Sequence, residues 1–175
     1  MFSDAISSRA PEFSRMYCHS GGASVPPTSS VGTPTSGTVV IVANRAGSGA
    51  EWSFEDVWTN NDVTMDMSTG VLIGTSVFGF SPRNSGQFFA IDANTGQTLW
   101  LSEPRQGDNA AIVRAGDLWF ALETDAELVV ARANPKQFEI LKRYTVADSS
   151  TWAQPVLSGQ RVFVKDISTI SLWTL

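Results

Sequence analysis

Residues 89–100 read FAIDANTGQTLW, and this stretch decides the fold. Two largely apolar runs flank a short polar loop in which Asp92 and Asn94 can accept hydrogen bonds from turn amides. Gly96 can take the positive φ that a tight turn needs without steric cost. The stretch therefore predicts a β-hairpin whose strands flank an Asp-Ala-Asn-Thr-Gly loop.

A second kind of hairpin occurs three times and aligns without gaps, at residues 71–78, 113–120 and 156–163. Each copy has a valine three residues before a glycine and a phenylalanine four residues after it. The glycines are 42 and 43 residues apart, and they are Gly74, Gly116 and Gly159. The hairpin of residues 88–100 follows the first copy, and residues 128–144 follow the second. Two hairpins give four strands in about 42 residues, which is the size of one propeller blade.

These repeats predict an all-β chain that forms a partial β-propeller of about three four-stranded antiparallel blades. The expected units are a partial blade at 38–60, full blades at 63–102 and 109–146, and a partial blade at 152–175. They hold about 13 strands, fewer than a ring of four to eight blades requires. We therefore expect a C-terminal fragment of a longer propeller, with open faces that aggregate unless a second copy covers them.

Residues 1–37 differ in composition from the remainder of the chain. Residues 20–38 read SGGASVPPTSSVGTPTSGT, which offers almost no apolar surface to bury. Such a composition does not offset the entropy of ordering the backbone. We predict that residues 1–37 are a disordered or linker segment, and that residues 38–175 are the propeller blades.

Composition excludes several classes of function. The chain has 175 residues, 12 Lys and Arg against 17 Asp and Glu, and a net charge of −5, so nothing favours nucleic-acid binding. Cys18 and His19 are the single residues of their kinds, which excludes an internal disulfide and any zinc site or triad that needs two of them. No apolar run is long enough to span a membrane. Residues 1–30 do not have the pattern of a secretory signal.

The stretch 89–100 closely resembles the repeat of the pyrroloquinoline-quinone-like (PQQ-like) β-propellers, whose signature is approximately Ala-x-Asp-x-x-Thr-Gly-x-x-x-Trp. The match is complete in this unit, degraded in the next and cut off in the last. The matching residues are Ala90, Asp92, Thr95, Gly96 and Trp100. The resemblance implies that the Trp docks between blades and that the Asp and Gly shape a turn.

The resemblance leaves the activity open, because the family contains quinoprotein dehydrogenases that bind the quinone and calcium as well as cofactor-free members such as the BamB-like lipoproteins. Our leading interpretation is a non-enzymatic scaffold or protein-interaction module of the BamB-like branch. It has no cofactor, and its partners are other proteins or the missing blades. One alternative is a fragment of a PQQ-dependent oxidoreductase whose ligands lie in missing blades. Another is a sensor propeller attached to a kinase or a membrane anchor. The resemblance suggests the periplasm or cell envelope.

Few residues are candidates for chemistry, and we predict no catalytic, cofactor or metal residue. Asp62 and Asp66 could serve as carboxylates, but their surroundings lack the alternating oxygen ligands of a calcium loop. The six tryptophans, Trp52, Trp58, Trp100, Trp119, Trp152 and Trp173, are interpreted as packing between blades. The loop at residues 81–87, with Arg83 and Asn84, is the best candidate for an interaction loop. Residues 168–173 also resemble the end of a WD40 blade, but the Gly-His of that repeat is missing.

Overall fold

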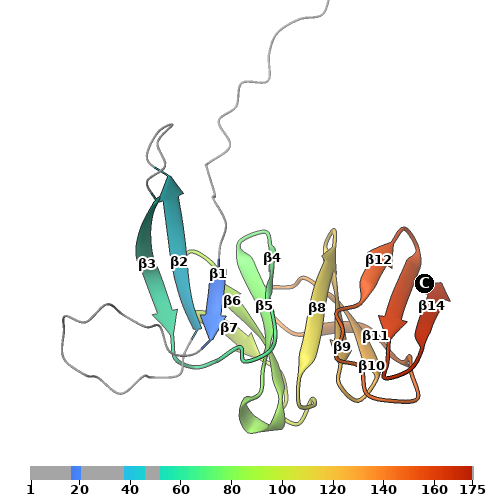
Figure 1. Ribbon diagram of the computed structural model, residues 1–175. Helices are drawn as coiled ribbons and strands as arrows, with labels where there is room; N and C mark the ends of the chain where they lie inside the picture. The colour runs from blue at the N-terminus through green and yellow to red at the C-terminus, as the bar shows by residue number, and fades with distance from the viewer. Residues whose placement is uncertain (1–16, 21–37, 46–51, 175) are drawn as a thin grey trace, which may run out of the picture.

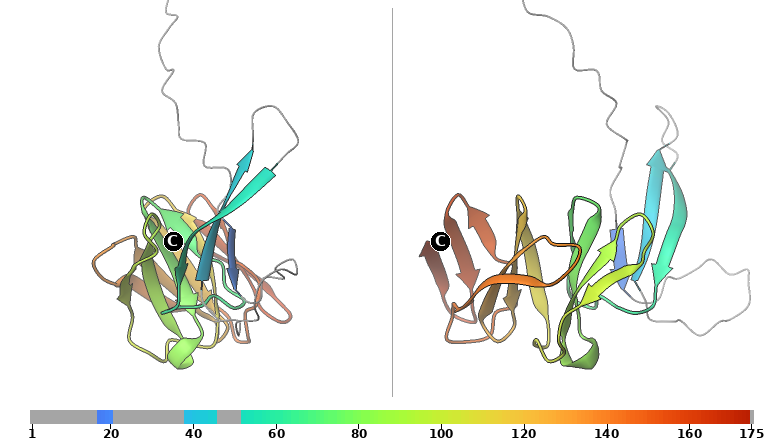
Figure 2. Two further views of the ribbon diagram at one scale, coloured as in Figure 1. Left: turned by 90° about the vertical axis from the view of Figure 1, so that its left-hand side faces the viewer. Right: turned by 180° about the vertical axis from the view of Figure 1, so that it is seen from behind.

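The computed structural model describes residues 17–20, 38–45 and 52–174. These ranges contain fourteen strands in four antiparallel sheets and one short 3-10 helix, η1 (Arg83–Ser85). The four sheets stand side by side in the order of the chain, as the blades of a propeller do (Figure 1). Seen from behind, the row runs in the opposite direction, and each sheet faces its neighbours in sequence (Figure 2).

Each sheet is a meander in which consecutive strands pair. The first sheet consists of β1 (Tyr17–Ser20), β2 (Thr38–Arg45) and β3 (Trp52–Asn60). The second sheet consists of β4 (Val71–Ile73), β5 (Ser76–Ser81), β6 (Gln87–Asp92) and β7 (Thr98–Leu101). The third sheet consists of β8 (Ala110–Ala115), β9 (Leu118–Glu123), β10 (Glu127–Arg132) and β11 (Glu139–Thr145). The last sheet consists of β12 (Val156–Ser158), β13 (Arg161–Lys165) and β14 (Ile170–Thr174).

The tight turns and the register repeat from sheet to sheet. Gly74, Gly116 and Gly159 have φ of +62°, +66° and +60° in the turns that join the two strands of each repeated hairpin. A register shift occurs where β2 pairs with β3, where β6 pairs with β7 and where β10 pairs with β11. This shared irregularity identifies β2 and β3 as the third and fourth strands of their blade.

Three apolar clusters hold the sheets together, one at each junction. Alternation along β9 explains how one strand serves two junctions, because Trp119 packs toward the second sheet and Phe120 toward the last. Phe78, Phe80 and Phe88 fill the junction between the second and third sheets and are fully buried. Burying one such side chain contributes about 2–3 kcal/mol. Hydrophobic contact between blades therefore fixes the arrangement of the sheets.

The prediction of an all-β partial propeller is confirmed, with fourteen strands in place of about thirteen. The additional strand is β1, which lies within the segment 1–37 that we predict to be a disordered or linker segment. These four residues pair with β2 along the backbone, and composition alone does not reveal such pairing. Residues 1–16 and 21–37 lie outside the described residues. In the described ranges, no helix has the length and apolar character needed to cross a bilayer.

Candidate functional site

The loop between β6 and β7 is built around the Asp92 carboxylate. Its Oδ1 accepts hydrogen bonds from the backbone N–H groups of Asn94 and Thr95, each at 2.9 Å, and from Thr95 Oγ1 at 3.1 Å. These bonds, led by that from the Thr95 amide, hold the pKa of Asp92 below its ordinary value. Asp92 therefore shapes the turn, and its carboxylate is stabilised by hydrogen bonds from the loop itself.

The first sheet holds this loop through Trp58. The indole Nε1 of Trp58 donates to Ala93 O at 2.9 Å, and the ring lies against Gly96. A Cβ at Gly96 would be 2.5 Å from Cδ2 of Trp58, and the φ of Gly96 is +74°. Asn60 Nδ2 also donates to Gly96 O at 2.7 Å. Only glycine meets both requirements of this position, the backbone conformation and the close approach of the indole.

Trp100 repeats this arrangement one sheet further along. Its Nε1 donates to Asn134 O in the loop between β10 and β11, at 2.8 Å, and its ring stacks on Phe138 with centroids 5.5 Å apart. In the third sheet the equivalent position holds Lys142, since Lys142 pairs with Val130 as Trp100 pairs with Ala90. The docking of tryptophan between blades is therefore present at two sheets and absent from the third.

The other tryptophans differ from one another. Trp119 is fully buried, and Trp173 Nε1 donates backward to Val146 O at 3.1 Å. Trp152 is 62 % exposed, so packing between blades is the wrong interpretation for this residue. It lies in the connector before β12, outside the sheets. The side chain of Trp52 is outside the described residues.

Strained backbone gathers at the opposite end of the strands from the Asp92 loop. The four non-glycine residues with positive φ in the described part of the chain are Asn84, Ser85, Arg105 and Ala126. The loop at 82–86 pairs with the connector at 102–107, through Arg105 N to Asn84 O at 3.2 Å and Gln106 N to Gly86 O at 3.0 Å. Each such residue costs about 1–2 kcal/mol, which the surrounding contacts must offset.

The loop that we predict as an interaction loop belongs to this region. Arg83 Nη1 donates to Asn61 O at 2.6 Å and to Asp62 O at 3.0 Å, and Asn84 Nδ2 donates to Gln87 Oε1 at 2.7 Å. Both side chains thus hold loops of their own chain together. An interaction at Arg83 and Asn84 stays a prediction.

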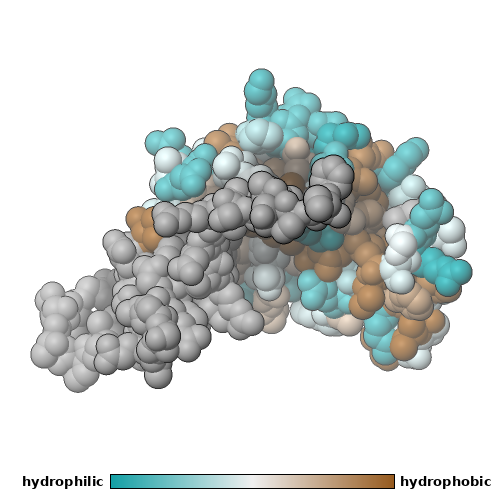
Figure 3. All heavy atoms as spheres, turned by 90° about the horizontal axis from the view of Figure 1, so that it is seen from above, coloured by the Kyte–Doolittle hydropathy of each residue, from teal (hydrophilic) through white to brown (hydrophobic). Residues whose placement is uncertain are grey.

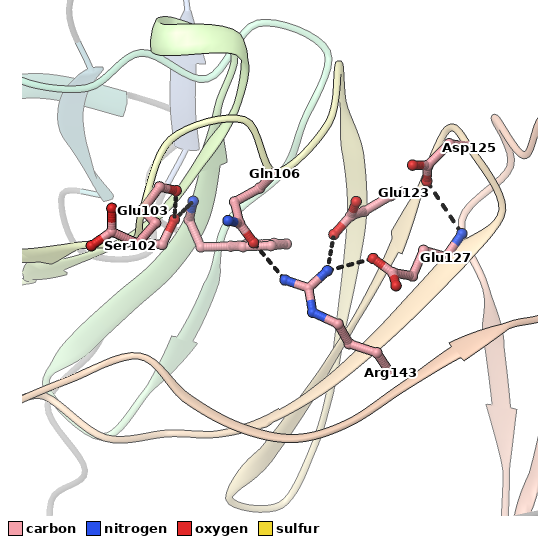
Figure 4. Close-up of polar contacts among 8 residues, drawn as sticks. Ser102, Glu103, Gln106, Glu123, Asp125, Glu127 and Arg143 are labelled. Atoms are coloured by element: carbon pink, nitrogen blue, oxygen red, sulfur yellow. Dashed lines mark hydrogen bonds and ion pairs between the residues drawn. The ribbon is translucent and has the colours of Figure 1, made fainter.

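Beside these loops lies a carboxyl that the sequence analysis missed, that of Glu123 at the end of β9. Its side chain is 1 % exposed, and its Oε1 lies 3.5 Å from Arg143 Nη1 without accepting a hydrogen bond. Figure 4 shows the carboxylates of Glu123 and Glu127 converging on the guanidinium of Arg143, with Gln106 on its other side. Arg143 donates to both Glu127 and Gln106. The network links the third sheet to the connector from the second sheet.

Burial raises the pKa of Glu123 to about 8, against the opposing effect of the Arg143 charge. The Glu123 carboxyl is therefore mostly protonated at neutral pH, and Glu127 balances the charge of Arg143. The signal that could have revealed Glu123 is weak, because Glu-Thr-Asp-Ala-Glu at 123–127 resembles an ordinary solvated turn. Through Arg143, the network holds two carboxyls of the third sheet against Gln106 in the connector from the second sheet.

The described residues contain no cluster of side chains that could hold a calcium ion. No three His, Cys, Asp or Glu side chains in this part of the chain come together to hold a metal ion. Asp62 accepts a hydrogen bond from Thr98 Oγ1 at 2.7 Å, and Asp92 is held in its turn.

The last sheet presents an unusual surface, which we call the outer face. Its residues alternate with Val162 and Val164, which are buried against the third sheet, and so point away from that sheet. They are Val156, Ser158, Arg161, Phe163, Lys165, Ile170, Leu172 and Thr174. A groove of about 420 Å³ lies here, lined in part by Gln154, Val156, Phe163 and Ile170.

The centre of the outer face is an apolar row across all three strands. Val156, Phe163 and Leu172 are opposite one another and are 58 %, 36 % and 53 % exposed. In the repeated hairpin Phe163 corresponds to Phe78 and Phe120, which are 0 % and 3 % exposed because the next sheet covers them. Apolar and hydrophilic residues are interspersed at this end of the molecule, on the right of Figure 3.

Comparison with solved structures relates this arrangement to known proteins. BamB from Moraxella catarrhalis superposes on 78 % of the chain with a TM-score of 0.57 and 12 % sequence identity. The chain has the fold of a PQQ-like β-propeller. The PQQ-like blades described here span 42 % of BamB, less than half of its length.

Other comparisons add no further assignment for these PQQ-like blades. A europium-containing methanol dehydrogenase superposes on 54 % of the chain and 19 % of its own length, with a TM-score of 0.44 and 18 % identity. The computationally designed Ika8 protein superposes on 78 % of the chain and 55 % of its own length, with a TM-score of 0.37 and 11 % identity. No protein-family model and no curated protein sequence matches the chain.

Proposed function

We propose that the chain is a propeller scaffold that binds protein through the outer face of its last sheet. One observation carries this proposal: Phe163 is exposed where its equivalents Phe78 and Phe120 are buried beneath another sheet. Contiguous exposed apolar residues are typical of surfaces that bind another protein, which supports this proposal.

The composition of the outer face supports binding of a separate protein surface. Arg161 and Lys165 flank Phe163 along β13, where the third sheet has Leu118 and Leu122 flanking Phe120. Both charged residues are exposed, as is usual for the rim of a protein interface around an apolar centre. The outer face is therefore more polar than the interfaces inside the chain.

The experiment compares the proteins retained by the tagged chain with those retained by Leu172→Asp. Leu101→Asp is the matched control, because Leu101 is a similarly exposed leucine at 43 %, on β7 of the second sheet. We expect Leu172→Asp to lose binding of proteins, including further copies of the chain, while Leu101→Asp retains it. Equal retention by all three, at unchanged melting temperatures, would overturn the proposal.

The quinoprotein alternative is tested separately by titration with the quinone and calcium, followed by visible absorbance. The proposal expects no stoichiometric binding. Stoichiometric binding that survives Leu172→Asp would favour a redox role over the scaffold.

A further inference from the structure

We propose that an open polar pocket between the first and second sheets binds a neutral saccharide. The pocket has a volume of about 530 Å³ and lies where the end of β3 meets the loop between β6 and β7. It is separate from the outer face, so the inference goes beyond the proposed function. The residues that line it are Thr59, Asn60, Asn61, Asp62, Thr95, Gly96, Gln97 and Thr98.

Asn60 builds a rigid floor for this pocket. The residue is 5 % exposed, and its Nδ2 donates to Gly96 O at 2.7 Å and to Thr98 Oγ1 at 2.9 Å. Its Oδ1 accepts hydrogen bonds from the backbone N–H groups of Asp62 at 2.8 Å and Val63 at 3.3 Å. A carboxamide has two donors and two acceptor positions, so all four are used inside the protein. Asn60 therefore holds both sides of the pocket in place.

Thr98 connects Asn60 to the only charged group among the lining residues, the Asp62 carboxylate. Thr98 Oγ1 accepts from Asn60 Nδ2 and donates to Asp62 Oδ2 at 2.7 Å. Asp62 Oδ2 is the oxygen that the described residues engage, which leaves Oδ1 to accept a bond from a ligand. Because the carboxylate is already oriented by a donor on β7, a ligand does not have to order it on binding.

The rim of the pocket supplies further hydrogen-bonding groups. Thr59, Asn61 and Gln97 are exposed there. A hydroxyl or a carboxamide both donates and accepts, whereas a carboxylate only accepts. The pocket thus offers donors and acceptors together, and these match sugar hydroxyl groups, each of which also donates and accepts. Its volume is within the usual range of sites for small molecules.

The lining also indicates which ligands the pocket does not favour. Among the described residues that line it, none has an apolar side chain, so an apolar ligand would gain little from burial. None of them is Lys, Arg or His, and the carboxylate of Asp62 repels an anion. Calcium takes several carboxylate and carbonyl oxygens, whereas this pocket has one carboxylate. A neutral polyhydroxylated molecule is the ligand class that agrees with all three observations.

The first experiment records proton–nitrogen correlation spectra of the isotopically labelled chain, whose mass of 18.9 kDa suits the method. The probes are glucose, galactose, mannose and N-acetylglucosamine, together with the neutral disaccharides of each. We expect at least one probe to shift the backbone signal of Gly96 and the side-chain amide signals of Asn61 and Gln97. The dissociation constant should be about 1–10 mM, because each hydrogen bond made in competition with water contributes modestly. No shift of these signals with any probe at tens of millimolar would overturn the inference.

Two substitutions test the roles of Asp62 and Thr98. Asp62→Asn, at an exposed position, should weaken saccharide binding about five- to tenfold without changing the melting temperature, because a charged acceptor is replaced by a neutral one. Glu103→Gln, at an exposed carboxylate outside the pocket, is the matched control and should bind as the wild type does. Thr98→Val removes the donor to Asp62 and should also weaken binding, whereas Thr98→Ser should restore it. Binding that Asp62→Asn leaves unchanged would contradict the proposed site.

Cations are the competing ligands for a pocket that contains one carboxylate. The same spectra are therefore recorded with calcium chloride and with putrescine, at matched concentration and ionic strength. A larger shift of the pocket signals with either cation than with every saccharide would show a cation site at Asp62, and the inference would be wrong. Leu172→Asp should retain the saccharide shifts, because the outer face lies on another sheet. Failure of the proposed function at the outer face is therefore distinguishable from failure of this site.

Discussion

The indole of Trp58 covers the α-carbon of Gly96, two residues from different sheets, with 2.5 Å between Cδ2 and the place that a Cβ would take. The contact joins the first sheet to the second at the loop that also provides the family signature. Gly96 therefore has two roles, one in the backbone of its turn and one in the docking of a neighbouring blade.

Gly96→Ala should consequently cost more than an ordinary turn glycine. Gly74→Ala is the matched control, since Gly74 has φ of +62° but open space around its α-carbon. We expect a loss of about 1 kcal/mol for Gly74→Ala and about 3 kcal/mol for Gly96→Ala in urea unfolding. Equal losses would show that the indole contact contributes nothing.

Trp58→Phe keeps an aromatic ring but removes the donor to Ala93 O. We expect unfolding to become easier by about 1–2 kcal/mol, because a partly buried carbonyl loses its partner. Trp152→Phe, at a side chain that is 62 % exposed, should change stability by less than about 0.5 kcal/mol. Similar effects from both substitutions would contradict a specific role for the Trp58 hydrogen bond.

Glu123→Gln should change how stability depends on pH. The pKa of Glu123 is raised from 4.5 to about 8 in the folded chain, so the folded state retains a proton that the unfolded state releases. Its contribution is complete below pH about 4.5 and is lost as the pH rises through about 8. The variant should lack this decline, measured as the unfolding free energy between pH 5 and 9. Glu103→Gln, at an exposed carboxylate, should retain it.

Asp92→Asn should change the stability of the folded chain at acidic pH. The turn amides hold the pKa of Asp92 below its ordinary value, so its contribution is present above the unfolded pKa and is lost as the pH falls through the folded one. The variant should show a weaker loss of stability on acidification, followed by circular dichroism. Asp108→Asn, at an exposed position, is the control, and an identical acid limb in both variants would refute the assignment.

The hairpins could be predicted from sequence because their determinants are local. Asp92, Thr95 and Gly96 act on one turn, and Gly74, Gly116 and Gly159 recur at one place in a repeat. Sequence alone also indicated that Trp100 docks between blades, since the resemblance assigns that role to its position. Turns of this kind can be predicted from sequence without knowing which sheets are neighbours.

The Glu123 network could not be predicted, because its parts come together only in the folded chain. Gln106 lies in a connector and Arg143 in a different strand, and neither is close to Glu123 in sequence. Strand β1 could not be predicted for a related reason, since it joins the first sheet by backbone pairing. Trp152 was misinterpreted because an aromatic residue near a strand suggests packing wherever a chain is rich in tryptophan.

The third sheet has Lys142 where the two earlier sheets have a tryptophan. We therefore expect the sheets to separate from one another in a defined order. Among the described residues, the seam before the last sheet has no indole reaching forward, and the indole that bonds backward across it is Trp173, which is 41 % exposed. Trp58 and Trp100, which bridge the two earlier seams, are half-buried. When the chain is heated or pulled from its C-terminal end, β12–β14 should detach first and as one unit, while the earlier sheets stay joined. The force needed to detach each further sheet should then be larger.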